Sequence, residues 1–245
     1  TVVADVALIH GAKSKYSPWL RPGNVFHDEI DRQVRRLQLG KVVSFGWSGK
    51  SGPPNSLITT VKEHIAVAKK YALEIAAGVT PRNPKNGIAV PLHIIAHSNG
   101  GLIASLISQM LDFAAAADDE NFFLISAPAK DDVRAQEKNP FKKFNTTIMR
   151  CRALIAKAVI EVRAKLRAQK KQPIKIEQLI MLGTPFDPLL YAVNMRVVKK
   201  MCFLFSPKDN IQRYFGLTRY PVGNNIVNFR IAIKAPSGGI FFPMH

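Results

Sequence analysis

The stretch HIIAHSNGG (93–101) places a serine where a run of strand-forming aliphatic residues stops. The residues two before and two after Ser98 are Ala96 and Gly100, and Gly101 follows. A sharp turn from a strand into a helix forces its apex residue towards positive φ and crowds these neighbours, so they must be small. This is the context of a nucleophilic serine. The alternative is a Ser98 that only caps the following helix.

A nucleophilic serine also needs donors for the oxyanion that its attack creates. The backbone N–H of Asn99, directly after the serine, is one expected donor. The other is expected from the loop that follows an earlier strand, in LIHGAKSKYSPW (8–19). There His10 and Gly11 let the backbone turn towards the serine, which makes the N–H of Ala12 the second donor. The place of His10, between a strand and a glycine, favours loop stabilisation over a role as base.

Aromatic and small residues near these two segments are expected around the mouth of the site. The possible pocket residues are His10, Gly11, Tyr16, Trp19, Trp47 and Ser48. The aromatic ones could contact an acyl chain, and the alternative is that one or two of them pack the core. The sequence contains no metal-binding cluster, P-loop or dinucleotide fingerprint, so we expect neither a metal nor a cofactor.

Six short apolar runs predict the strands that position these residues. They lie at 6–11, 41–47, 92–98, 178–185, 201–207 and 225–233. Apolar residues on consecutive positions are typical of strands buried on both faces of a parallel sheet. Helical patterns occupy 59–78 and 100–113, the latter apolar nearly all round and therefore expected to be buried. The alternation predicts an α/β fold with a mostly parallel central sheet flanked by helices.

Four segments in order carry a resemblance to a known superfamily: ALIHGAKSKYSPWLRPG, FGWSGKSG, IIAHSNGG and LIMLGTPF. Together they resemble the lipase/esterase branch of the α/β-hydrolases, and more narrowly bacterial lipase-like proteins with HG…W, WSG, HSxGG and TPF signatures. The resemblance spans about residues 6–245, apart from one basic segment. The chain departs from the usual G-x-S-x-G pattern by having Ala96 at the first glycine, which is sterically acceptable.

The resemblance implies a catalytic triad in the chain order Ser, then Asp or Glu, then His. Asp209 follows the penultimate predicted strand, the usual position of the acid, and Asp187 follows the strand before it, a position that some lipases use. We favour Asp209, whose alternative role is a surface turn in SPKDN. Of the six histidines only His245 follows either acid, so it is the expected base.

The positive charge of the chain is concentrated in one segment. The formal net charge is +18, and residues 130–175 contain 14 Lys/Arg against 4 Asp/Glu. Within this segment 148–171 has an apolar stripe among basic residues, which predicts an amphipathic helix. Either it is an ordinary surface helix, or 127–175 forms a helical cap inserted into a single domain of residues 1–245. In the second case its cations would face anionic lipid.

The sequence therefore predicts a serine hydrolase of carboxylic esters, of the lipase or phospholipase kind, with peripheral contact to an anionic membrane. The same triad would serve a thioesterase or amidase. The alternative is a hydrolase fold with weak or no activity that binds anionic lipid or nucleic acid. Nucleic acid is not expected, because few aromatic residues interleave with the basic ones. With no run of about 18 apolar residues and no signal peptide visible, we expect a soluble protein.

Overall fold

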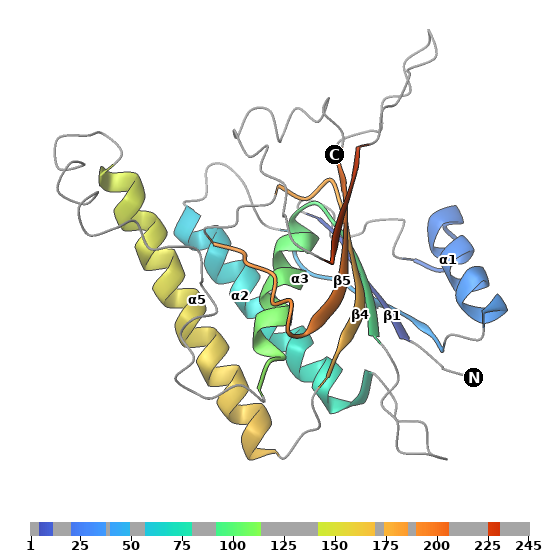
Figure 1. Cartoon of the computed structure of the whole chain (residues 1–245), viewed down its shortest axis with the longest axis horizontal. Coiled ribbons are helices and arrows are strands. Elements are labelled where there is room, and N and C mark those ends of the chain that lie inside the picture. Colours follow the sequence, from blue (N-terminus) through green and yellow to red (C-terminus); the bar gives the residue numbers. More distant parts are fainter. Residues whose placement is uncertain are drawn as a thin grey trace, which may run out of the picture.

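A single parallel sheet forms the centre of the molecule (Figure 1). The computed structural model describes residues 5–11, 21–37, 40–49, 57–79, 92–113, 142–169, 174–185, 190–205 and 225–230. Its strands are β1 (Asp5–Ile9), β2 (Val42–Phe45), β3 (Leu92–His97), β4 (Ile176–Leu182), β5 (Val198–Phe205) and β6 (Ile226–Arg230). They lie in the order β2-β1-β3-β4-β5-β6, and every pairing is parallel. All six predicted strands and the parallel sheet are confirmed.

Helices cover both faces of this sheet. They are α1 (Val25–Arg36), α2 (Leu57–Glu74) with its π-helical continuation η2 (Ile75–Val79), α3 (Asn99–Met110) and α5 (Lys142–Ala168). In Figure 1, α2, α3 and α5 lie on one side of the sheet and α1 on the other. α1 was not predicted, although the Asn24 side chain accepts a hydrogen bond from Phe26 N–H (3.0 Å) and so marks its start.

The alternation of side chains along the strands separates two cores. Ala7 and Ile9 of β1 point into the larger core with α2, α3 and α5, whereas Val6 and Leu8 pack with Val34 of α1. α3 is buried from Gly100 to Met110, as predicted. The expectation of burial on both faces was wrong for β6, where Phe229 remains 51% exposed. β6 is the last strand in the sheet order, so among the described residues a neighbouring strand pairs with it on one side only.

The apolar stripe of α5 belongs to the larger core. Cys151, Ile155, Val159 and Leu166 are buried with residues of α2 and α3, which confirms an amphipathic helix. Whether 127–175 forms a cap over the site stays a prediction, since residues 114–141 and 170–173 lie outside the described part of the chain.

One basic residue of α5 does not lie on the cationic face where the sequence pattern placed it. Arg163 is 1% exposed. Its Nε donates to the carbonyl oxygen of Gln109 (2.9 Å), and its guanidinium lies 3.8 Å from Asp112 Oδ2. Asp112 also accepts hydrogen bonds from Asn194 Nδ2 (2.7 Å) and Arg196 Nε (3.0 Å). This buried polar cluster attaches α5 to the end of α3. Its hydrogen bonds and ion pair explain how the charged side chain of Arg163 can be buried.

Candidate active site

Ser98 lies between the last residue of β3 and the first residue of α3. Its φ of 52° and ψ of −128° make it the one non-glycine residue with positive φ in the described ranges. Such a conformation costs about 1–3 kcal/mol in a residue with a Cβ. The Ser98 side chain makes no capping hydrogen bond to α3 and is half-buried. Ser98 therefore occupies the N-cap position without capping the helix through its side chain, and it lies at the apex of a strained turn.

Regular structure on both sides holds this strained residue in place. Ser98 N–H donates to the carbonyl oxygen of Leu182 at the end of β4 (2.8 Å), and Gly101 N–H donates to Ser98 O (2.9 Å). The serine is thus tied to a strand and to a helix at once, which is the condition under which strain persists.

The small residues around the turn are required by close backbone contacts. A Cβ on Gly100 would lie 2.5 Å from the carbonyl oxygen of Ile9 and 2.6 Å from that of His10. A Cβ on Gly101 would overlap the side chain of Thr184, which follows β4. Ala96 is fully buried. The first turn of α3 therefore packs directly on the ends of β1 and β4.

At the start of the loop after β1, Gly11 lies close to Ser98. A Cβ on Gly11 would lie 2.6 Å from Ser98 Cβ and 3.2 Å from Ser98 Oγ, so only glycine lets the backbone pass here. Asn99 is the first residue of α3, at the positive end of the helix dipole. Both backbone segments that were expected to stabilise an oxyanion therefore flank Ser98, while Ala12 lies outside the described residues.

His10 and Trp47 connect this loop to the end of β2. The backbone N–H of Trp47 donates to His10 Nε2 (2.9 Å), and the indole Nε1–H donates to the carbonyl oxygen of His10 (2.8 Å). Because Nε2 accepts, the proton of the neutral ring is on Nδ1, which donates to Gly11 O (2.7 Å). Burial lowers the pKa of His10. With both ring nitrogens engaged, His10 stabilises the loop.

Trp47 is 6% exposed and packs against other buried aromatic rings. Its ring meets His64 of α2 edge-on (5.7 Å), and His64 Nδ1 lies 2.8 Å from the hydroxyl oxygen of Tyr191. The neighbouring Ser48 donates to Glu63. This packing fits the alternative in which Trp47 belongs to the core. The sequence holds no signal for the His64–Tyr191 pair, whose members lie 127 residues apart.

The other predicted site residues, Tyr16, Trp19, Asp187, Asp209 and His245, lie outside the described residues and stay predictions. The topology of the sheet nevertheless shows which strand each acid and the histidine follow. Ser98 follows β3, the two acids follow β4 and β5, and His245 follows β6, and these four strands are consecutive in the sheet. Since all are parallel, their carboxyl ends share one edge, where ligands bind in open α/β sheets.

The strand order and the strained serine between β3 and α3 together decide the fold. The chain has an α/β-hydrolase fold.

Comparisons with known proteins gave distant structural matches. The sequence matches no protein-family model and no curated protein. A cell surface hydrolase assigned in Lactobacillus plantarum is 8% identical, with a TM-score of 0.41 over 94% of this chain and 82% of the other. An esterase from Pyrobaculum calidifontis is 13% identical, with a TM-score of 0.35 over 94% and 67%. Esterase B from Lactobacillus rhamnosis is 12% identical, with a TM-score of 0.35 over 94% and 65%. These values are too low to indicate a function.

Proposed function

We propose that the protein is a serine hydrolase that cleaves carboxylic esters. The observation that carries the proposal is Ser98 itself: a serine at φ 52° with no capping bond, placed between a helix N-terminus and the Gly11 backbone. A strained conformation that the surrounding structure holds in place is typical of a functional position. In the proposed reaction Ser98 Oγ attacks the acyl carbonyl, and the N–H groups of Asn99 and Ala12 stabilise the oxyanion.

The proton transfers are assigned by the order of the chain. His245 accepts the Ser98 proton during attack and donates it to the departing alkoxide, leaving an acyl-enzyme. It then deprotonates the water that releases the acid and returns the proton to Ser98. Asp209 orients the imidazole and stabilises its charged form, with Asp187 as the alternative acid. The strand order supports this assignment, because Ser98, the two acids and His245 follow four strands that are consecutive in the sheet.

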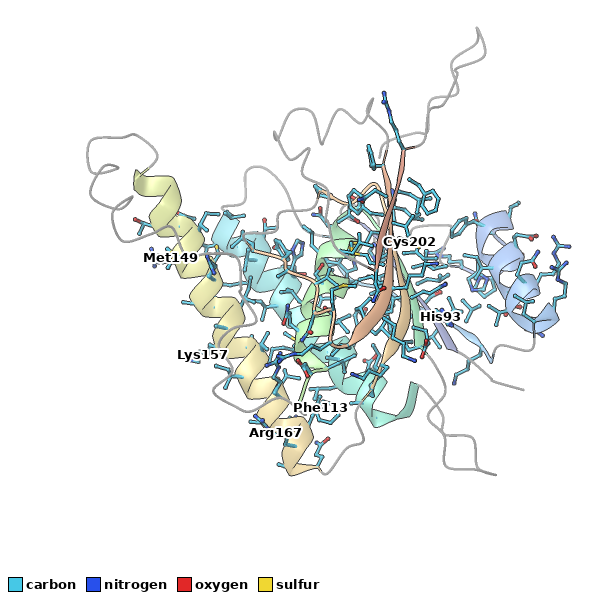
Figure 2. All side chains as sticks on the ribbon, in the orientation of Figure 1. His93, Phe113, Met149, Lys157, Arg167 and Cys202 are labelled. Carbon is cyan, nitrogen blue, oxygen red and sulfur yellow. The ribbon has the colours of Figure 1, made fainter. Side chains whose placement is uncertain are left out.

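We further propose lipid esters as the substrate class, presented at an anionic surface. The support is the outer face of α5, where Arg150, Lys157 and Lys165 are exposed together with Met149, which is 58% exposed. Figure 2 shows Met149, Lys157 and Arg167 pointing outward along this helix. Cations beside an exposed apolar side chain suit contact with anionic headgroups. In the described ranges no helix is both long and apolar enough to span a membrane.

Labelling with a fluorophosphonate probe tests the nucleophile. The intact chain should be labelled at Ser98, and Ser98→Ala should abolish labelling. Ser44→Ala, a change of an exposed serine on β2, should leave it unchanged. An intact, folded chain that never reacts would contradict the proposal, and vesicle binding by that chain would then favour the binding module.

Paired substitutions separate the two candidate acids. Asp209→Asn should lower kcat by about 10⁴-fold with little change in KM, because a triad acid holds the histidine in its working tautomer. Asp187→Asn should change kcat by less than about tenfold. The measurement is steady-state hydrolysis of a short soluble ester. The reverse pattern would assign the acid to Asp187.

A further inference from the structure

The peptide group after Gly11 is oriented by a side chain. His10 Nδ1–H donates to the carbonyl oxygen of Gly11 at 2.7 Å, and this contact is buried. A peptide unit is planar and trans, so the direction of a C=O group sets the direction of the N–H group of the next residue. The His10 hydrogen bond therefore fixes the direction of the Gly11 carbonyl, and the same peptide unit carries the N–H that the proposed function assigns to the oxyanion.

His10 is in turn held by Trp47 from two sides. The Trp47 backbone N–H donates to His10 Nε2 (2.9 Å) and its indole N–H donates to His10 O (2.8 Å). The two rings are stacked, with centroids 5.5 Å apart and planes 16° apart. His10 is 0% exposed and Trp47 6% exposed, so water does not compete for these bonds.

We infer that His10 and Trp47 form a clamp that holds the Gly11 carbonyl, beside Ser98, and through this peptide unit positions the second oxyanion donor. The inference rests on the proposed function. Oxyanion donors work only when they are held close to the position that the charge will occupy, because they then need no reorganisation during the reaction. Gly11 has no side chain with which to anchor itself, and the clamp supplies that anchor. His10 and Trp47 are thus positioning residues, which touch the loop rather than the substrate.

Two substitutions of His10 separate positioning from packing. His10→Leu removes both ring hydrogen bonds and should lower kcat by about 10²–10³-fold, the effect of losing one oxyanion donor. His10→Asn places an amide N–H near the position of Nδ1 and should recover at least tenfold of that loss. KM for a short ester should stay within about threefold in both variants. Trp47→Phe keeps the stacking but loses the bond to His10 O and should give an intermediate kcat.

His64→Asn is the matched control, because His64 is another fully buried histidine in the same aromatic group. It should lower the melting temperature while kcat of the folded protein is retained. A folded His10→Leu with normal kcat would overturn the inference, as would equal kcat losses in His10→Leu and His64→Asn.

A readout without catalysis keeps this inference separate from the proposed function. The ¹⁵N order parameter of the Ala12 amide should fall from about 0.85 to below about 0.6 in His10→Leu, and should not change in His64→Asn. If the unaltered chain hydrolyses no ester, the proposed function fails while the order parameter still tests the clamp. An Ala12 amide that stays rigid in His10→Leu would refute the clamp whatever the activity.

Discussion

Ser98 carries the strain of the site, and this strain can be measured. Ser98→Ala and Ser98→Gly both remove the hydroxyl, but only glycine adopts φ 52° without a steric cost. We expect Ser98→Gly to be more stable than Ser98→Ala by about 1 kcal/mol, within the range of about 1–3 kcal/mol for such strain. Urea unfolding of both variants is the measurement. Equal stabilities, or a more stable alanine variant, would show that the turn is not strained.

His64 should make the fold sensitive to acid. Burial lowers its pKa from 6.5 to about 4, and its Nε2 has no hydrogen-bond partner within the described residues. As the pH is lowered, the unfolded chain therefore binds a proton at His64 before the folded chain does. The free energy of unfolding decreases as the pH falls from about 6.5 towards 4. Between about pH 7.5 and pH 5 this group should lower the free energy of unfolding by about 2 kcal/mol.

The substitution His64→Gln removes the titrating ring and should make this loss smaller by about the same 2 kcal/mol. Urea unfolding of both proteins at the two pH values gives the comparison. If the variant loses as much stability as the unaltered chain between these values, His64 is not the group responsible.

At the scale of elements, α3 can approach β1 closely because Gly100 has no side chain. Alanine there would gain up to about 1 kcal/mol of helix propensity. However, its Cβ would lie 2.5 Å from the carbonyl oxygen of Ile9, a backbone atom that cannot rotate away. The steric clash should outweigh the gain in helix propensity. We therefore expect Gly100→Ala to destabilise the protein by about 1–3 kcal/mol and to reduce fluorophosphonate labelling.

Gly46 provides the control for this substitution. It follows β2, its φ is not positive, and a Cβ there would meet no atom within 4 Å. Gly46→Ala should therefore leave the free energy of unfolding unchanged or slightly raised. If both glycine variants behaved alike, the close approach of α3 to β1 would not be the reason for Gly100.

At the scale of the whole molecule, exposed cations lie along the outer face of α5. Replacing Arg150, Lys157 and Lys165 by Gln should weaken binding to anionic vesicles by about 100-fold, since each cation near such a surface contributes about 1 kcal/mol. Hydrolysis of a short soluble ester should be unaffected. Arg163 is left unchanged because it is buried.

The matched control removes three charges from the opposite side of the sheet. Arg32, Arg35 and Arg36 are exposed on α1, so their replacement by Gln lowers the net charge equally. Sedimentation with vesicles of phosphatidylserine and phosphatidylcholine should show a loss for the α5 variant alone. Similar losses in both variants would indicate attraction by net charge, and no loss in either would leave α5 as an ordinary solvated helix.

The sequence alone determined the sheet and the position of the serine turn. The strands could be predicted because a run of consecutive aliphatic residues is a local pattern. The serine turn could be predicted because the small residues around Ser98 reflect a steric requirement between neighbours in the chain. The apolar stripe of α5 could be predicted for the same reason, because its spacing is also a local pattern.

Only the tertiary structure decided which polar groups meet. His10 and Trp47 lie 37 residues apart, Arg163 and Gln109 lie 54 apart, and His64 and Tyr191 lie 127 apart. A histidine or an arginine has the same local pattern whether it faces water or a partner. Its burial depends on a group that a different element brings to it, as Gln109 and Asp112 of the α3 end do for Arg163. For this reason the basic pattern of α5 predicted a charged face, while the packing of α3 against α5 placed one of its charges in the core.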